Sequence, residues 1–210
     1  MKSIRVAAII PAYNEEATIA DVVAPLVASP LVDQVLVISD GSTDQTKKRA
    51  EDAGAEVCEL PQKGGKGEAM RYAVTKTTAP VLAFFDGDLI GITTDHVKQL
   101  LTPVLSGSRM MNIGIRDRGL FWTPIFHRLP LISGQRAMRR SVFEKVPKEF
   151  MRGFMIESSL NYFCRSHRLP YGAVDLSGLL VRRKFEKVSF PRAVIQYIGM
   201  FWQVAHAIMA

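Results

Sequence analysis

Short, continuous apolar runs alternate with helical patterns along residues 5–85 of the chain. Uninterrupted runs of this kind are typical of strands buried on both faces of a parallel sheet. Three such runs occur, at residues 5–11, 34–39 and 80–85, and residues 56–60 predict a further short strand. The segments between them predict helices at residues 15–28, 42–54 and 68–76. This alternation predicts a single α/β domain built on a parallel sheet with right-handed crossovers.

Two of the predicted helices carry local signals that refine their ends. Pro25 lies inside the first helix and is expected to weaken its last turns, because proline lacks the backbone N–H. The second helix is expected to start at Ser42, with Asp44 and Gln45 in its first turn.

Polar segments, most of them containing glycine, follow the predicted strands. They are residues 12–15 (AYNE), 40–44 (DGSTD), 63–67 (KGGKG) and 86–88 (DGD). Ligands of parallel α/β sheets collect at the carboxyl ends of the strands, which share one edge. Four polar segments at that edge therefore predict a binding site.

The segment Asp86-Gly87-Asp88 places two carboxylates on a tight glycine turn directly after a buried strand. Hard oxygen ligands at such a position suit Mg²⁺ or Mn²⁺, and such a cation suits a diphosphate. A solvated turn is the alternative, because surface turns are rich in Asp and Gly.

Composition and charge narrow the class of protein. The chain has 210 residues, of which 48% are hydrophobic and 22% charged, which is typical of one folded globular domain. The net charge of +7 admits a nucleic acid, an anionic small molecule or an acidic membrane surface as partner. Its basic residues form small groups without interleaved aromatic residues, so we expect no nucleic-acid partner. Such groups occur at residues 47–49, 139–140 and 182–184.

Cysteine usage and the two chain ends bear on the compartment. Cys58 and Cys164 are too few for a disulfide framework, and the first apolar run is too short for a signal peptide. We therefore expect a cytoplasmic protein. Residues 190–210 have apolar positions at helical spacing, which predicts a C-terminal apolar helix. It is expected to dock on the domain; the alternatives are a helix at the membrane surface, making the protein peripheral, or a homodimer contact.

The motifs together resemble a known family. Residues 11–15 (PAYNE), 40–44, 65–67 and 86–88 resemble the nucleotide-sugar domain of the family 2 glycosyltransferases, over about residues 5–105. Residues 133–140 (SGQRAMRR) and 152–157 (RGFMIE) resemble acceptor-side segments of glucosyl-3-phosphoglycerate synthases and polyprenyl-phosphate sugar synthases.

The resemblance implies the GT-A fold, a Rossmann-like α/β domain with a mixed, mainly parallel sheet flanked by helices. This domain would span residues 1–189, with a nucleotide-sugar half (1–105) and an acceptor half (106–189), before the C-terminal helix at 190–210. The implied activity is a metal-dependent transfer of sugar from a UDP- or GDP-sugar, with Mg²⁺ or Mn²⁺, to a phosphate-bearing or hydroxyl acceptor. An anionic acceptor would be phosphoglycerate-like or a lipid phosphate. A non-catalytic sugar-nucleotide-binding or scaffold protein of the same fold is the alternative.

The resemblance also implies the site residues. Those expected to bind the nucleotide sugar are Pro11, Ala12, Tyr13, Asn14, Glu15, Asp40, Gly41, Ser42, Lys66, Gly67, Asp86, Gly87, Asp88, Gly134, Gln135, Arg182 and Arg183. Asp88 would be the direct metal ligand, with Asp86 holding the ribose or the water on the metal. Lys66 would reach the diphosphate as a mobile point charge.

Two residues would contact the nucleoside. Asp40 would accept hydrogen bonds from the N–H of the base, which favours uracil or guanine; a turn-forming Asp is the alternative. Glu15 would hold a ribose hydroxyl, or else merely favour the helix dipole.

On the acceptor side, a phosphate is already anionic and needs only cationic positioning, for which Arg109, Arg136 and Arg182 are the candidates. Arg109 would be carried there by a strand over residues 107–115. A hydroxyl acceptor would instead need a base, and Glu157 is the candidate carboxylate. Glu157 also suits the N-terminus of a helix over residues 157–165 simply by its charge.

One departure from the resembling phosphoglycerate enzymes concerns the metal. Those enzymes carry a late histidine that completes the metal site, whereas residues 180–185 here read LVRRKF. Either Arg182 or Arg183 replaces that ligand with a direct phosphate contact, or the metal keeps an extra water.

Overall fold

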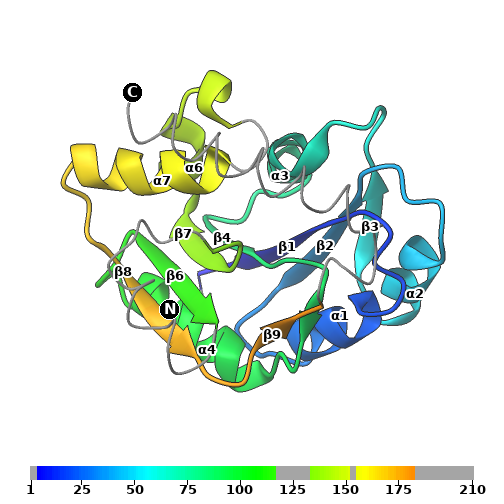
Figure 1. The fold of residues 1–210 in the computed structure, drawn as a ribbon. Helices are drawn as coiled ribbons and strands as arrows, with labels where there is room; N and C mark the ends of the chain where they lie inside the picture. The colour runs from blue at the N-terminus through cyan, green and yellow to red at the C-terminus, as the bar shows by residue number, and fades with distance from the viewer. Residues whose placement is uncertain (1–3, 117–132, 152–154, 183–210) are drawn as a thin grey trace.

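A seven-stranded sheet forms the centre of the computed structural model, which describes residues 4–116, 133–151 and 155–182. The sheet has the strand order β3-β2-β1-β4-β7-β6-β8 (Figure 1). Its strands are β1 (Val6–Ala12), β2 (Gln34–Ser39), β3 (Glu56–Glu59), β4 (Val81–Phe84), β6 (Met111–Arg116), β7 (Arg136–Arg139) and β8 (Tyr171–Leu176).

Strand direction follows the prediction for the first half of the chain. Strand β1 pairs in parallel with β2 and β4, and β2 pairs in parallel with β3. Strand β7 runs antiparallel between β4 and β6, and β6 pairs in parallel with β8. The sheet is therefore mixed and mainly parallel, which confirms the predicted fold class.

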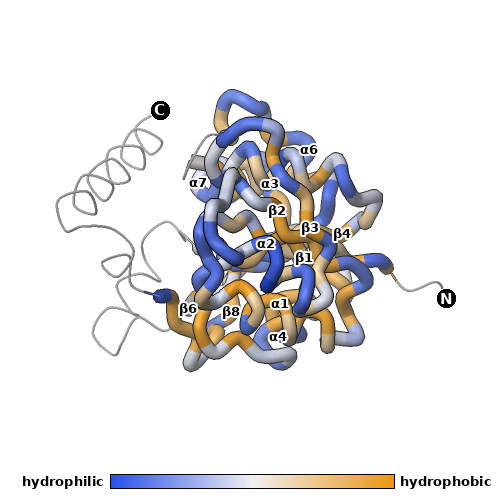
Figure 2. Tube along the Cα trace, turned by 90° about the vertical axis from the view of Figure 1, so that its right-hand side faces the viewer, coloured by the Kyte–Doolittle hydropathy of each residue, from blue (hydrophilic) through white to orange (hydrophobic). Residues whose placement is uncertain are grey.

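Helices cover both faces of the sheet (Figures 1 and 2). On one face lie α1 (Ile19–Val27) and α4 (Thr94–Leu105), with the largely hydrophilic α2 (Thr46–Asp52) beside α1. On the other lie α3 (Gly65–Thr75), α6 (Arg140–Lys145) and α7 (Met155–Ser166), with a short 3₁₀ helix η1 (Lys148–Phe150).

Strand β1 shows why the apolar runs are continuous. Val6, Ala8 and Ile10 pack into the core cluster that contains α1 and α4. Ala7 and Ile9, which point the other way along the pleat, pack into the cluster that contains α3 and α7. Both faces of the strand are buried, so a polar residue at any of these positions would have no access to water.

A second, two-stranded ribbon extends the structure. Strand β5 (Leu89–Ile90) pairs antiparallel with β9 (Leu180–Val181), so a segment from the end of the described chain returns beside the Asp86–Asp88 turn.

The predicted starts of the three helices in the first half of the chain were wrong. Helix α1 begins at Ile19 rather than Glu15, because residues 15–18 form a turn in which the Glu15 carbonyl accepts from Thr18 and Ile19. Helix α2 begins at Thr46 rather than Ser42, because the Asp44 carboxylate accepts the Thr46 N–H. Helix α3 begins at Gly65, three residues earlier than predicted.

The expectation for Arg109 was also wrong. Strand β6 begins at Met111, and Arg109 precedes it at the edge of the sheet opposite the carboxyl ends of the parallel strands. Its guanidinium donates to the Asn112 side chain and to the Ala173 carbonyl 3.1 Å away. Arg109 therefore ties β6 to β8 and lies away from the predicted site.

Among the described residues, no helix combines the length and the apolar character needed to cross a bilayer. The predicted C-terminal helix at 190–210, with its membrane and dimer alternatives, lies outside the described residues, as does Arg183.

Candidate functional site

The loops that follow β1 and β2 are joined through Asn14. Its backbone N–H donates to Ser42 Oγ (3.1 Å), and its Oδ1 accepts from the Thr43 N–H (2.9 Å). Asn14 adopts a positive φ of 54°, a conformation that Asn tolerates better than most residues. The two loops therefore form one rigid rim at the carboxyl edge of the sheet.

Asp40 joins the β2 loop to the start of α3. Its two carboxylate oxygens accept the N–H groups of Gly64 (2.8 Å) and Gly65 (2.9 Å), and the residue is buried. These bonds satisfy backbone donors at the helix start, which is why α3 begins earlier than its apolar pattern predicts. In the structure Asp40 thus organises a loop; its contact with a base stays a prediction.

Gly87 lets the β4 loop approach the β1 loop closely. A Cβ at this position would lie 3.2 Å from Glu15 Cγ and 3.5 Å from Ala12 Cβ. The Thr18 hydroxyl, which the sequence analysis missed, donates to the Gly87 carbonyl at 2.8 Å. Four segments that the sequence predicted at one edge are therefore connected there.

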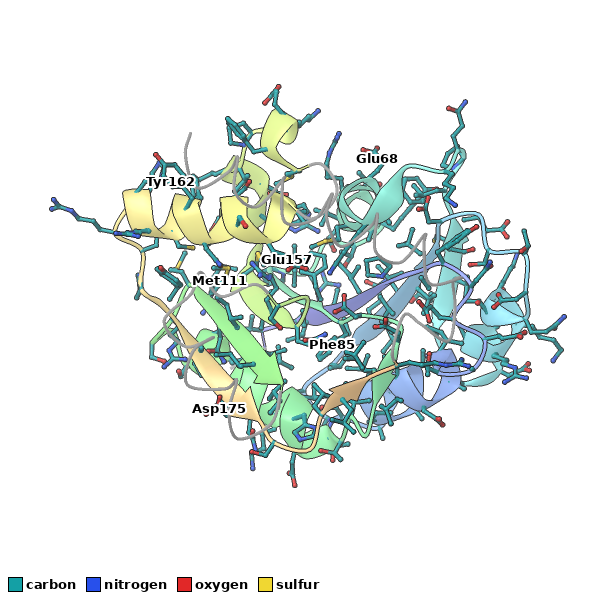
Figure 3. All side chains as sticks on the ribbon, in the orientation of Figure 1. Glu68, Phe85, Met111, Glu157, Tyr162 and Asp175 are labelled. Carbon is teal, nitrogen blue, oxygen red and sulfur yellow. The ribbon has the colours of Figure 1, made fainter. Side chains whose placement is uncertain are left out.

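Lys66, Asp86 and Glu157 form the charged centre of this edge. Lys66 Nζ lies 2.7 Å from Asp86 Oδ1 and 2.6 Å from Glu157 Oε1. Burial on its own would lower the pKa of Lys66, but the two carboxylates outweigh it and raise that pKa above its usual value. Glu157, labelled in Figure 3, comes from the first turn of α7 and is buried. The ammonium is therefore held protonated between the two halves of the fold.

The loop before β7 holds the other oxygen of Asp86. Gln135 Nε2 donates to Asp86 Oδ2 at 2.8 Å. Gly134 lies directly beneath this carboxylate, since a Cβ there would be 2.2 Å from Asp86 Oδ2. The Ser133 hydroxyl, also missed from the sequence, donates to the Gly114 carbonyl and contacts Gln135 Oε1, which orients this loop.

Arg136, which was predicted to position the acceptor, is buried behind the edge of the site. Its side chain is fully buried and donates to the Ser133 carbonyl (2.7 and 3.1 Å) and to the Glu157 carbonyl (3.1 Å). Burial lowers the pKa of Arg136, although the neighbouring carboxylates of Glu157 and Asp86 oppose that change. Its cross-strand partners Phe84 and Ile113 pack into the cluster that contains α7, so the pleat directs Arg136 toward that helix.

Asp88 and Arg182 lie opposite each other where the β5–β9 ribbon ends. The Arg182 N–H donates to the Asp88 carbonyl at 2.9 Å, which continues the ladder beyond Leu89 and Val181. Arg182, the predicted phosphate-binding residue, therefore lies next to Asp88, the predicted metal ligand, although 94 positions separate them in the sequence (182 − 88). Both residues are partly buried.

The residues present fit a divalent cation only in part. Both Asp86 oxygens are bonded, to Lys66 and to Gln135, and Asp88, on the same turn, stays the candidate ligand predicted from the sequence. Within the described ranges no group of three His, Cys, Asp or Glu side chains is arranged to hold a metal. Mg²⁺ commonly binds through one or two carboxylates together with substrate phosphates and water. Asp88 therefore fits a cation that arrives with a diphosphate.

These observations define the class of protein. A mainly parallel α/β sheet with a polar, charged site at its carboxyl edge, completed by a segment returning from the second half, is the GT-A arrangement. The chain belongs to glycosyl transferase family 2, whose family model matches residues 7–161.

Similar proteins include several named glycosyltransferases. The chain is 40% identical over 111 residues to the glucosyl-3-phosphoglycerate synthase of Mycolicibacterium smegmatis, covering 48% of this chain and 36% of that protein. It is 46% identical over 99 residues to glycosyltransferase AglJ of Haloferax volcanii, covering 46% of this chain and 31% of the relative. The chain thus spans about a third of the length of these relatives.

Solved structures give a wider match. The glucosyl-3-phosphoglycerate synthase of Mycobacterium tuberculosis, in complex with Mn²⁺, UDP-glucose and phosphoglyceric acid, superposes with a TM-score of 0.79. The sequences are 25% identical, and the match covers 97% of this chain and 79% of the other. A second structure of that enzyme, with phosphoglyceric acid, has a TM-score of 0.74 at 29% identity, covering 85% and 72% of the two chains.

Proposed function

We propose that this chain transfers a sugar from a nucleoside-diphosphate sugar to a phosphate-bearing acceptor. The observation that carries the proposal is the position of the Lys66 ammonium, 2.7 Å from Asp86 at the edge where four loops meet. A protonated lysine at the rim of such a site suits the diphosphate of a donor. Family membership supports the same conclusion.

The donor proposed is a UDP-sugar, with UDP-glucose as the first candidate. The similar synthase of Mycobacterium tuberculosis has been crystallised with UDP-glucose and Mn²⁺. Asp40 is the residue that would accept the N–H of uracil, a role that guanine would also satisfy. A GDP-sugar is therefore the donor against which the proposal has to be tested.

The chain's own residues would stabilise the departing diphosphate. Negative charge grows on the diphosphate oxygens as the sugar–oxygen bond breaks, and fixed positive charge lowers the energy of that state. Lys66 and Arg182 would supply this charge, one from each half of the fold. Bound at Asp88, Mg²⁺ or Mn²⁺ would act as a Lewis acid on the same oxygens.

A phosphate-bearing acceptor is favoured over a hydroxyl acceptor by the state of Glu157. Its carboxylate is buried and ion-paired with Lys66 at 2.6 Å, so it is poorly placed to take a proton from an acceptor. An acceptor that attacks through an ionised phosphate oxygen needs no base, whereas one that attacks through a hydroxyl needs one whether or not it also bears a phosphate. Arg182 is the described residue that would position its phosphate.

One observation favours a lipid phosphate over a phosphoglycerate-like acceptor. Ile90 and Leu180 are cross-strand partners in the β5–β9 ribbon and are 45% and 52% exposed. Directly opposed residues of an antiparallel pair point to the same face, and the backbones of Asp88 and Arg182 are bonded two positions further along the ladder. An acceptor with an apolar chain next to its phosphate would cover this exposed pair.

Calorimetry with UDP and GDP, each with and without Mn²⁺, tests the donor. We expect UDP to bind, and to bind more tightly with Mn²⁺; absence of binding by either nucleotide would contradict the proposed function. Turnover of UDP-glucose with a polyprenyl phosphate or with phosphoglycerate then tests the acceptor. Nucleotide binding without turnover of any donor–acceptor pair would favour the non-catalytic alternative.

A further inference from the structure

Six residues at the carboxyl edge form a closed ring of hydrogen bonds and ion pairs. Starting at the buried end, the Arg136 guanidinium donates to the Ser133 carbonyl, and the Ser133 hydroxyl oxygen accepts from the Gln135 backbone N–H at 3.4 Å. Gln135 then donates to Asp86, and Asp86 pairs with Lys66. Lys66 pairs with Glu157, whose carbonyl accepts from Arg136 and so closes the ring. We call this set the Arg136 ring: Lys66, Asp86, Ser133, Gln135, Arg136 and Glu157.

The ring connects side chains from both halves of the fold, in addition to the backbone ladder between β4 and β7. Asp86 follows β4 and Lys66 opens α3, both in the nucleotide-sugar half. Ser133, Gln135 and Arg136 belong to the β7 segment and Glu157 to α7, both in the acceptor half. A displacement of either half would therefore break at least one bond of the ring.

Burial decreases from one side of the ring to the other. The side chain of Arg136 is 0% exposed and Glu157 is 4% exposed. By contrast, the side chains of Lys66 and Asp86 are 19% and 25% exposed, at the rim of the site. The polar groups that face a ligand are thus backed by groups that no ligand reaches.

The charges of the ring cancel. Lys66 and Arg136 contribute two positive charges, and Asp86 and Glu157 contribute two negative ones, so the sum is zero. Replacing Arg136 by a neutral residue would leave one net negative charge beneath the site. That charge would oppose a diphosphate, and the Glu157 and Ser133 carbonyls would lose a donor.

We propose that Arg136 is a positioning residue for donor binding: through Ser133 and Glu157 it fixes Gln135 and Lys66, and so the Lys66–Asp86 pair, before the donor arrives. This proposal rests on the proposed function, because the ring would position groups for a nucleoside diphosphate. If Arg136 were only structural, replacing it would lower the stability of the fold and weaken donor binding only as far as the fold is lost. A positioning role predicts weaker donor binding in protein that is still folded.

Arg140 provides a matched control. It is also an arginine of the β7–α6 segment, its side chain is 19% exposed, and it donates to backbone carbonyls, those of Val74, Thr77 and Ala79. These carbonyls lie at the end of α3 and just before β4, at the opposite edge of the sheet. Arg140→Met therefore removes a comparable set of bonds outside the ring.

The test measures two properties of the 210-residue chain and its variants: UDP affinity, by calorimetry in the presence of Mn²⁺, and melting temperature. We expect Arg136→Met to weaken UDP binding by about tenfold or more, the scale typical of residues that support a ligand-binding group. Arg136→Lys, which keeps the charge without the fork of donors, should recover part of that loss. Arg140→Met should lower the melting temperature but leave UDP affinity within about twofold of the wild type.

Four results would overturn the proposal. Unchanged UDP affinity in Arg136→Met would make Arg136 merely structural, and so would an equal loss in Arg140→Met. If Arg136→Met does not fold, Gln135→Leu cuts the ring at Asp86, and unchanged UDP affinity in that variant overturns the proposal instead. A wild-type chain that binds neither UDP nor GDP would overturn both the proposed function and the role of the Arg136 ring. If the wild type binds UDP, a negative result with the variants overturns only the role of the ring.

Discussion

Lys66 Nζ and Glu157 Oε1 are 2.6 Å apart although 91 positions separate the two residues in the sequence. Lys66 lies in the first turn of α3 and Glu157 in the first turn of α7, and both helices cover the same face of the sheet. This ion pair joins the half of the fold that would bind the nucleotide to the half that would bind the acceptor. The predictions below follow from this pair and from the groups around it.

Replacing Lys66 with Met should weaken both binding and stability. The change leaves Asp86 and buried Glu157 without their shared cation, and breaking a largely buried ion pair in this way costs roughly 3 kcal/mol. Urea unfolding and UDP calorimetry measure the two effects. If Lys66→Met keeps wild-type stability and wild-type UDP affinity, the ion pairs of Lys66 with Asp86 and Glu157 contribute to neither.

The same ion pair predicts a particular pH dependence. Because the folded-state pKa of Lys66 is raised, its contribution is fully present below the unfolded value of about 10.4 and is lost only as the pH rises through the higher folded value. The difference in unfolding free energy between the wild type and Lys66→Met should therefore be the same at pH 7 and pH 9. A difference that changes between pH 7 and pH 9 would contradict a raised pKa for Lys66, because it would place the titration of the ammonium below its ordinary range.

Asp88→Ala should lower turnover by about 100-fold, the scale of a lost charge-stabilising group. It should also abolish the effect of Mn²⁺ on UDP affinity, which calorimetry detects without turnover. Asp95→Ala serves as the control, because Asp95 is an exposed carboxylate in the first turn of α4. Retained Mn²⁺ linkage in Asp88→Ala would place the metal elsewhere.

Gly134→Ala should damage the site while leaving the fold intact. The new methyl group would lie 2.2 Å from Asp86 Oδ2, so the carboxylate has to move away from Lys66 and Gln135. A displacement of about 1 Å can cost about 100-fold in rate. Steady-state kinetics and circular dichroism separate the two effects.

Gly172→Ala is the matched control for that change. A Cβ at Gly172 would lie 2.6 Å from Arg109 Cζ, a comparable clash that lies far from the carboxyl edge. It should affect stability more than turnover. If both variants lose the same activity, the effect of Gly134→Ala is not specific to Asp86.

Cys164 should be unreactive in the folded chain at pH 8. Burial raises the pKa of its thiol to about 11, although the nearby Arg136 opposes this, so the thiol stays protonated. A disulfide reagent should label half-buried Cys58 first and Cys164 only after denaturation. Stability should also fall as the pH rises from about 8.5, the unfolded thiol pKa, toward the folded value, and Cys164→Ala should reduce this fall. Rapid labelling of both cysteines at pH 8 would contradict the prediction.

The strands were predictable because a strand that is buried on both faces is apolar at consecutive positions, a pattern that is visible in the local sequence. Each apolar run of the first half became a strand, and the polar segments after β1, β2 and β4 reached one edge, as parallel pairing requires. The helix starts were less predictable. The Asp40 carboxylate decides where α3 begins, and Asp40 lies 25 positions before Gly65, beyond the reach of any local pattern.

Some residues of the candidate site were likewise predictable from the sequence, and others were not. Asp86, Asp88 and Lys66 stood out as candidates because carboxylates and lysine next to glycine are chemically distinctive in the sequence. Arg136 looked like an exposed phosphate-binding arginine, yet the tertiary structure buries it. Nothing in its neighbouring residues distinguishes a guanidinium aimed at a ligand from one aimed at backbone carbonyls.

The sequence by itself determined the layered α/β fold, the edge that carries the polar loops and the kinds of chemical group gathered there. Periodicity and residue type express those properties locally. Only the tertiary structure decided which charges meet: Lys66 with Glu157, and Arg136 with the Ser133 carbonyl. An ion pair depends on the distance between atoms, and for residues on different elements that distance is determined by how the helices pack on the sheet.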